Sequence, residues 1–448
     1  MKKKIVSTLL LLALALLVTA CGKKDQPASS TSKETGASSQ TEAKEDGKPV
    51  EIEFWHAMSG GNGETLEKLV AKFNETHKGI VVKPIFQGHY KDLFQKLSAS
   101  SQTGNLPTLS MIYGNRLTAY VMNKMVEPLD AYVNDPQNGF DKKIWDDIPV
   151  GLRDDGIWDG VRYSLPFNKG AYLMYYNVDA LKEHQLEPPK TWDELRQAAK
   201  ALTDQDHIGL VFNKSVGIDS SFWVEQAGGH IYDKEQDKVL IDSPAVKEAF
   251  SFLTGMIKDG IATINMEEGY ITGPMSRKES FIGFASSSNI PHMKEACEPT
   301  GVKWAVAKLP AGKKQAALFS GTDITMFNTS SPEQKKAAFE FLKFWFETET
   351  QTEWGINSGY MPLTNAALNS EKMQKYIKEE DPSKGIAAEM FDYAYQDPNA
   401  LNGYAIHSNM QKALEEVVSG QKDLDQALKD AQANAVKEME EAKRNVAK

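Results

Sequence analysis

The apolar positions near the start of the chain change their period several times. Apolar residues alternate with glutamates over 50–54, which is the period of a strand. After a glycine-rich turn at 59–63, apolar residues recur at i, i+3, i+4 and i+7 over 66–73, which marks one face of a helix. A second β-branched run at 80–86 and a second helical repeat at 90–97 follow. This order predicts a parallel sheet covered by helices.

Sheets of this kind bind ligands in the crevice beyond the carboxyl ends of their strands. The turns after Trp55 and before Tyr90 lie at those ends. The first turn, at 59–63, also precedes a helix, whose N-terminal N–H groups favour an anion. No Gly-Lys-Ser/Thr of a P-loop follows it, so it is either a plain turn or an anion cradle.

The rest of the chain continues to alternate between the two periods. Further strands are expected at 106–113, 172–177, 280–285, 302–306 and 323–327. Helices are expected at 116–125, after Thr191, Ser243 and Ser331 as capping residues, and from 409 to the end. A proline makes 163–167 extended. Segments near 165, 320 and 360 are candidate crossings between two lobes.

The first residues have the features of an export signal. Three lysines at 2–4 precede an apolar run of 14 residues, 5–18, which is too short for a comfortable membrane span. The run ends in Val-Thr-Ala followed by Cys21, which resembles the bacterial lipoprotein signal. The resemblance implies a signal peptide at 1–20, cleavage before Cys21 and acylation of its thiol. The alternative is an uncleaved signal anchor.

The residues after Cys21 have a different composition from the rest. Between 22 and 48 there is no aromatic and no branched aliphatic residue. Such a segment cannot bury apolar surface, so we expect 21–49 to be a disordered tether with a reach of roughly 30 Å. The 448-residue chain as a whole is 41% hydrophobic and 25% charged, as expected of a globular protein with large cores.

Charge and cysteine content exclude several classes of function. The net charge of −10 argues against nucleic acid, which requires clustered positive charge. Besides Cys21, only Cys297 is present, and we expect it to be an ordinary reduced thiol. The sequence has no GxSxG, no HExxH and no paired CxxC, so we expect no catalytic residue, metal or cofactor. The sequence does not exclude a pair of carboxylates for glycoside hydrolysis, because it contains 61 acidic residues.

Aromatic residues recur in the predicted loops, at Trp55, Tyr90, Trp223, Tyr360 and Tyr404. Sugars and polyols present C–H faces that stack on such rings, while a few convergent polar groups fix their hydroxyls. Each ring could equally belong to a core. For Tyr90 and Tyr360 the neighbouring Gly88 and Gly359 favour a ligand contact.

Motifs from residue 50 to the end resemble one family in order: IEFWHAMSG, FNETHKGIVV, SLPFN, LMYYNVDAL, PPKTWDEL, GYMPLT and SGQKDLDQAL. The sequence resembles family 1 extracellular solute-binding proteins of ABC importers, and most closely their glycerol-3-phosphate-binding subgroup. The resemblance implies ligand contacts at Tyr90, Trp223, Gly321 and Tyr360, and at a serine among Ser286, Ser287 and Ser288.

Three positions depart from that subgroup. Gly114 follows Tyr113 where the subgroup has a glutamate, and Lys169 stands where it has a serine. Ala405, flanked by Tyr404 and His407, stands where its phosphate-binding arginine lies. A phosphate favours a charge-assisted, bidentate donor. We therefore add Tyr404 and His407 to the candidate ligand-binding residues, with the hypothesis that Lys169 supplies the missing charge.

The resemblance implies an α/β, periplasmic-binding-protein-like fold of two lobes, each a mostly parallel sheet flanked by helices, with three crossings. We assign 50–165 with 320–358 to lobe one and 166–319 with 359–448 to lobe two. The implied protein is a monomer, anchored by lipid at the extracytoplasmic face of the bacterial cell membrane. It takes a small polar ligand to permease subunits and performs no chemistry.

Three functions remain open at this point. The first is capture of glycerol-3-phosphate, a glycerophosphodiester or a related polyol phosphate for an ABC importer. The second is the same role with an oligosaccharide as the cargo. The third is a surface-tethered glycoside hydrolase, which would release reducing sugar.

Overall fold

The computed structural model describes residues 48–267, 271–397 and 399–446. Gly47–Lys448 forms one compact unit. The predicted signal peptide, Cys21 and nearly all of the tether lie outside the described residues. None of the helices within those ranges combines the length and the apolar character that a membrane crossing requires.

The predicted strand–helix–strand–helix start is confirmed. β1 (Val50–His56) pairs in parallel with β2 (Ile80–Phe86) and with β3 (Leu109–Ile112). The helices between and after them are α1 (Gly60–Thr76), α2 (Tyr90–Thr103) and α3 (Gly114–Met122). Most of the expected glycine-rich turn forms the first turn of α1. A Cβ on Gly63 would lie 2.8 Å from the Met58 carbonyl oxygen, so the chain needs glycine there.

The other end of the same sheet is built from later strands. β7 (Ile208–Phe212) pairs in parallel with β10 (Ala262–Ile264) and β11 (Ser280–Ser286). β12 (Trp304–Ala307) pairs antiparallel with β6 (Ser164–Asn177). The main strand order is β10-β7-β11-β6-β13-β3-β1-β2, where β13 is Ala317–Met326. The fold is thus the expected α/β arrangement around a mainly parallel sheet.

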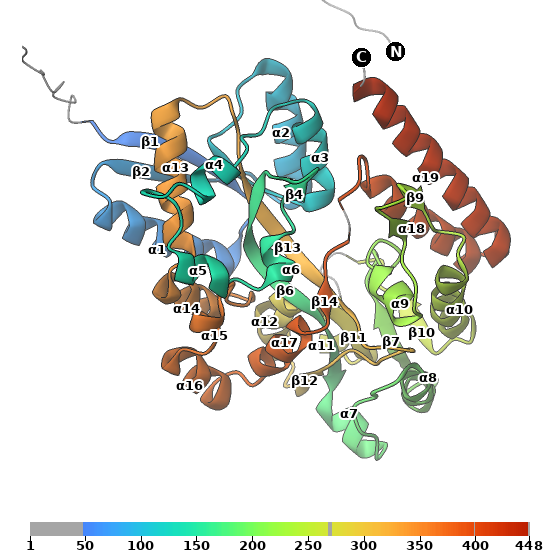
Figure 1. Ribbon diagram of the computed structural model, residues 1–448. Coiled ribbons are helices and arrows are strands. Elements are labelled where there is room, and N and C mark those ends of the chain that lie inside the picture. The colour runs from blue at the N-terminus through green and yellow to red at the C-terminus, as the bar shows by residue number, and fades with distance from the viewer. Residues whose placement is uncertain (1–47, 268–270, 398, 447–448) are drawn as a thin grey trace, which may run out of the picture. The chain divides into compact units, whose positions relative to one another are not determined.

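Two long strands join the ends of this sheet. β6 and β13 pair antiparallel from Phe319 opposite Ala171 to Thr325 opposite Ser164, with a register shift between Thr322 and Asp323 (Figure 1). The sequence predicted an extended segment at 163–167 and a separate strand at 172–177 in place of β6. The ladder with β13 runs from Ser164 to Ala171 and bridges the two, so that a single strand of 14 residues results.

The helices cover the sheet and follow their predicted caps. The side chains of Thr191, Ser243 and Ser331 accept hydrogen bonds from the N3 residues of the helices that they start. The remaining helices are α4 (Asp130–Val133), α5 (Lys142–Asp147), α6 (Val150–Arg153), α7 (Val178–Glu183), α8 (Trp192–Ala201), α9 (Ser221–Gln226), α10 (Pro244–Lys258), α11 (Thr272–Ser276), the 3-10 turn Ser287–Asn289, α12 (Ile290–Cys297), α13 (Pro332–Trp345), α14 (Thr348–Asn357), α15 (Asn365–Leu368), α16 (Glu371–Glu379), α17 (Ser383–Phe391), α18 (Tyr404–Val418) and α19 (Leu424–Val446). Short strands are β4 (Ile157–Trp158), β5 (Val161–Arg162), β8 (Tyr232–Asp233), β9 (Lys238–Val239) and β14 (Ala394–Tyr395).

The helical C-terminal region differs from the expected continuous helix. It begins at Tyr404 and divides after Val418 into α18 and α19. Gly420 between them has φ +74°, a left-handed conformation that ends a helix at low cost.

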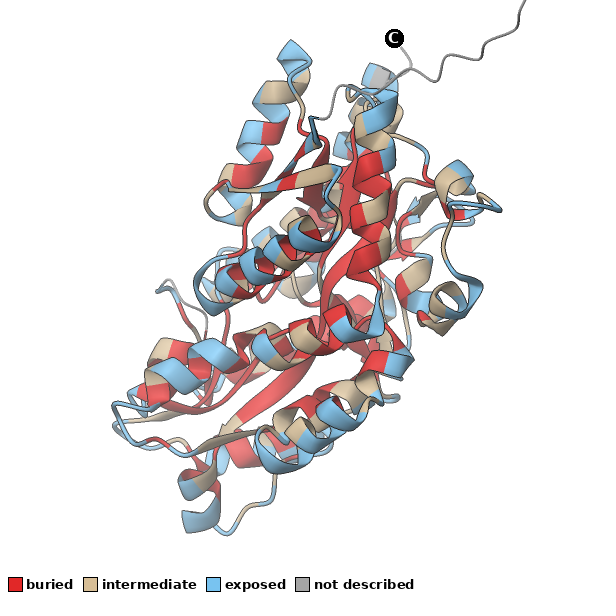
Figure 2. Cartoon of the chain, turned by 90° about the vertical axis from the view of Figure 1, so that its left-hand side faces the viewer, coloured by how far each residue is buried: buried red, intermediate tan, exposed pale blue. Residues whose placement is uncertain are grey.

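Two hydrophobic clusters fill the unit, one toward each end of the paired strands β6 and β13. Phe167 of β6 belongs to the cluster around Phe54, whereas Leu173 of the same strand belongs to the cluster around Trp223. The chain also passes between the clusters within β13 and in the segment after Tyr360, where Met361 belongs to the cluster around Trp223 and Leu363 to that around Phe54. Figure 2 shows the buried residues running along the strands, with exposed residues on the outer helix faces. The lobe boundaries assigned above stay a prediction.

Candidate functional site

Tyr90 and Tyr360 meet where the chain passes between the two clusters. Tyr90 is the first residue of α2, and Tyr360 follows α14. Their phenolic oxygens lie 3.3 Å apart. The Tyr360 ring stacks on Trp354 at 5.6 Å, and the Tyr90 ring lies 5.1 Å from that of Tyr113. Burial raises the pKa of the Tyr90 phenol, so this group stays a neutral donor and acceptor near pH 7.

Asn168 connects this pair to β13. Its amide nitrogen donates to the Tyr90 hydroxyl at 3.4 Å, and its oxygen accepts from the backbone and the hydroxyl of Thr322, both at 2.7 Å. Next to them, Gly321 has φ +116°. A Cβ on Gly321 would lie 1.6 Å from the Asn168 carbonyl oxygen, so only glycine allows the two strands to approach here.

The start of α1 contacts the same passage. The Asn62 amide oxygen accepts from the Gly359 N–H at 3.1 Å, and the Thr65 hydroxyl donates to the Asn357 carbonyl at 3.0 Å. The glycine-rich turn of the sequence therefore helps to fix the segment that carries Tyr360.

The three candidate serines lie at the end of β11 and in the 3-10 turn that follows. The Ser286 hydroxyl is hydrogen-bonded to that of Ser320 on β13, and it accepts from the N–H and the hydroxyl of Ser288 at 3.1 and 3.0 Å. A Cβ on Gly170 would lie 2.5 Å from the Ser287 oxygen. The buried Ser287 hydroxyl has no hydrogen-bond partner among the described residues. These hydroxyls form a polar group beside the β6 crossing.

Lys169 is buried and ion-paired. Its ammonium lies 2.7 Å from Asp155 and 2.8 Å from Asp323, and its side chain is 1% exposed. Burial alone would lower the pKa of Lys169, but the two carboxylates outweigh it and raise that pKa. Its charge is already balanced, so a phosphate would have to displace a carboxylate to reach it. The geometry does not favour the hypothesis that Lys169 grips the ligand.

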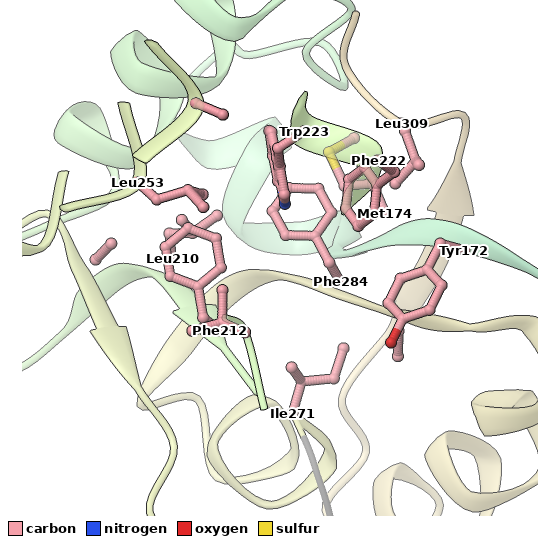
Figure 3. Close-up of a cluster of buried hydrophobic side chains, with 14 of the residues drawn as sticks. Tyr172, Met174, Leu210, Phe212, Phe222, Trp223, Leu253, Ile271, Phe284 and Leu309 are labelled. Carbon is pink, nitrogen blue, oxygen red and sulfur yellow. The ribbon is translucent and has the colours of Figure 1, made fainter. Parts of the chain in front are cut away.

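Trp223 lies inside a hydrophobic cluster. It is 2% exposed and contacts the rings of Phe222 and Phe284 at centroid distances of 4.9 and 5.2 Å (Figure 3). The ring of Trp192 lies 5.6 Å away. Its packing is that of a core residue, and the structure does not bring it to Tyr90.

Tyr404 and His407 lie one turn apart at the start of α18. Tyr404 is 37% exposed, and the guanidinium carbon of Arg116 lies 4.8 Å from its ring centroid. His407 is buried, with Nδ1 3.0 Å from the Ile218 carbonyl and Nε2 3.5 Å from Asp397. The two predicted residues therefore have different surroundings.

An acidic group near His407 was not predicted. Asp397 accepts from the Ser221 hydroxyl at 2.9 Å, and burial raises its pKa. Asp397, Tyr395 and Glu225 line part of a pocket of 390 Å³. Among the described residues, no three His, Cys, Asp or Glu side chains are placed to hold a metal ion.

Three further residues were missed by the sequence reasoning: Asn168, Ser320 and Arg116. Asn168 stands directly before Lys169 in the FNKG motif, so its place could have been found there. Ser320 and Arg116 carry no local signal, because their partners come from distant segments.

Comparisons with known proteins identify the family and the fold. A family model described as bacterial extracellular solute-binding protein matches residues 68–380. The sn-glycerol-3-phosphate-binding periplasmic protein UgpB of Yersinia enterocolitica is 26% identical over 353 residues, which cover 75% of this chain and 79% of that protein.

Two solved structures have the same fold. The GacH receptor of Streptomyces glaucescens, solved unliganded and with acarbose, has a TM-score of 0.77 at 16% identity, covering 88% of this chain and 99% of that one. UgpB of Mycobacterium tuberculosis, in complex with glycerophosphocholine, has a TM-score of 0.76 at 19% identity, covering 86% and 97%.

Proposed function

Because the chain belongs to the bacterial extracellular solute-binding proteins, we propose that it captures glycerol-3-phosphate, a glycerophosphodiester or a related polyol phosphate for an ABC importer. Membership of this family makes the protein a substrate-binding component of an ABC transporter and not an enzyme. This agrees with the sequence, which predicted a binding protein.

The observation that carries the proposal is the convergence of hydroxyl and amide groups on the passage between the clusters. Tyr90, Tyr360 and Asn168 come together there, with Ser286 and Ser320 on the adjoining strands. Neutral donors and acceptors beside aromatic rings suit a polyol. The name of the Yersinia relative supports a phosphate ester as the ligand.

In the proposed cycle the ligand binds between the lobes and shifts the balance toward a closed form. The permease subunits recognise that form, and a separate ATPase supplies the energy. The protein acts as a monomer, anchored through an acylated Cys21 at the extracytoplasmic face of the membrane.

An oligosaccharide is the second candidate ligand. The ring contacts of Tyr90 with Tyr113 and Phe94 support it, since sugar rings stack on such surfaces. The acarbose complex of the GacH receptor supports it as well.

A thermal-shift panel on the full chain, purified in detergent, tests both candidates. A ligand at 100 times its dissociation constant stabilises the folded state by about 2.7 kcal/mol. We expect a rise in melting temperature with sn-glycerol-3-phosphate or glycerophosphocholine, reversed by excess inorganic phosphate. If the melting temperature rises with maltodextrins alone, the ligand is an oligosaccharide and not a phosphate ester. Release of reducing sugar would contradict both.

A further inference from the structure

Arg116 occupies an unusual position between two aromatic rings. It lies in α3, and its guanidinium carbon is 4.9 Å from the ring centroid of Phe94 and 4.8 Å from that of Tyr404. Phe94, on α2, belongs to the hydrophobic cluster around Phe54. Tyr404 begins α18, whose buried residues belong to the cluster around Trp223. One cation therefore contacts elements from both sides of the passage.

The guanidinium has no anionic partner in the part of the chain that the structure describes. Within the described ranges, it forms no hydrogen bond and no ion pair, and its side chain is partly exposed. The other five arginines each have a carboxylate within 4.0 Å: Arg153, Arg162, Arg196, Arg277 and Arg444. In a chain with 61 acidic residues, an arginine that is held in place and left unpaired is conspicuous.

Stacking on the rings leaves the N–H groups of Arg116 available. A guanidinium placed over aromatic rings uses its flat face, whereas its five N–H donors point outward in the plane. That planar fork matches the oxygens of a phosphate and binds them with two parallel hydrogen bonds. The N-terminus of the 15-residue helix α18 lies at Tyr404 and adds partial positive charge there.

The position suits a ligand held by the hydroxyl groups already described. The Phe94 ring lies 6.3 Å from the Tyr90 ring, so two ring contacts separate Tyr90 from the guanidinium. Ala405, which stands where the resembling subgroup has its arginine, directly follows the residue on which Arg116 stacks. Arg116 of α3 therefore places a positive charge beside the start of α18.

We propose that Arg116 binds the anionic phosphate group of the ligand, while the hydroxyls around Tyr90 and Tyr360 bind its polyol end. The inference rests on the proposed function and deepens it, because it assigns the group that distinguishes a phosphate ester from a neutral sugar. It also assigns the charge to Arg116 in place of Lys169.

Calorimetric titration of the full chain in detergent tests the assignment, with sn-glycerol-3-phosphate, glycerophosphocholine and inorganic phosphate as probes. Arg116→Gln is expected to weaken phosphate-ester binding about 10- to 100-fold, as loss of a charge-assisted hydrogen-bond pair does. Arg116→Lys keeps the positive charge but loses the planar pair of N–H donors. Its affinity for the phosphate ester is expected to lie between those of the wild type and Arg116→Gln. Arg196→Gln, which removes a surface arginine on α8, is the matched control and should bind as the wild type does. Melting temperatures without ligand verify that each variant folds.

The outcomes separate the two proposals. If the wild type binds a phosphate ester and Arg116→Gln binds it with a dissociation constant within twofold of the wild-type value, Arg116 does not bind the phosphate. The proposed function would then still stand. Binding of inorganic phosphate alone, lost in Arg116→Gln, supports the anion site and overturns the polyol phosphate as the ligand. If the wild type binds none of the three probes, both proposals are wrong.

Discussion

The phenolic oxygens of Tyr90 and Tyr360 lie 3.3 Å apart, although 270 residues separate them in the chain. The contact joins the start of α2 to the segment after α14, and Asn168 of β6 approaches the same Tyr90 oxygen. Three segments of the chain thus share a single small group of polar atoms. This convergence gives the first prediction.

Tyr90→Phe and Tyr360→Phe are each expected to weaken ligand binding about three- to tenfold, because each removes one hydroxyl and keeps the ring. The dissociation constants are measured by calorimetry with the ligand that the thermal-shift panel identifies. Tyr376→Phe, on α16, is the control and should leave affinity unchanged. If all three variants bind the ligand with the affinity of the wild type, neither the Tyr90 nor the Tyr360 hydroxyl contributes to the site.

Gly321→Ala is expected to lower the free energy of unfolding by about 2 kcal/mol or more, measured by urea denaturation. The new Cβ would lie 1.6 Å from the Asn168 carbonyl oxygen, so β6 and β13 must separate. Gly301→Ala is the matched control. Gly301 also has a positive φ, +66°, but a Cβ there meets nothing within 4 Å. Equal losses in the two variants would show that backbone conformation, rather than strand contact, requires Gly321.

Lys384→Met is expected to weaken ligand binding, although Lys384 itself does not contact the ligand in the proposed site. The buried Lys384 ammonium donates to the carbonyls of Ser358 and Tyr360 at 2.6 and 2.8 Å, and so holds the segment that carries the Tyr360 ring. Burial lowers the pKa of Lys384 to about 8. We expect a loss of about 1–3 kcal/mol in unfolding free energy, since two carbonyls lose their donor. Lys378→Met, exposed on α16, should change neither the unfolding free energy nor affinity.

Asp155→Asn is expected to flatten the dependence of stability on pH. Burial, with the charge of Asp323 next, raises the pKa of Asp155 to about 7 despite the ion pair with Lys169. Because this folded-state pKa lies above the unfolded value of about 3.9, the folded protein binds more protons between these values. The wild type should therefore lose stability relative to the variant as pH rises from about 4 to about 7, and the difference should level off above. Melting temperatures at each pH measure this, with exposed Asp206→Asn as the control. A difference that stays constant from pH 4 to 8 would show that Asp155 is ionised throughout.

Cys21→Ser is expected to abolish lipid attachment, because the proposed acylation requires the thiol of residue 21. Mass spectrometry of the protein extracted from membranes measures the attached acyl groups. Cys297→Ser should leave attachment intact, since Cys297 is a buried free thiol at the end of α12. Acyl groups on the Cys21→Ser protein would contradict the proposed anchor.

The sequence was sufficient where the controlling interactions are local. The periods over 50–97 and the caps at Thr191, Ser243 and Ser331 identified helices and strands correctly, because a helix face or a cap depends on residues within a few positions. It failed at β6, where pairing with β13, over 150 residues away, decides that the strand continues past Lys169.

The candidate site shows the same division. Tyr90 and Tyr360 were chosen because of neighbouring glycines, and the structure brings them together. Trp223 has no such glycine beside it, and rings from three other elements bury it. Arg116 meets Tyr404 from 288 positions earlier in the chain, and no local pattern reports such a contact.

The paired strands β6 and β13 each contribute to both hydrophobic clusters, and this limits how the protein can be divided. A single cut in the gene cannot yield two fragments that each retain a whole core. A chimaera that exchanges one half with a relative needs three junctions, one in each strand and one after Leu363. With fewer junctions, unpaired strand edges would remain, and these recruit other molecules into aggregates.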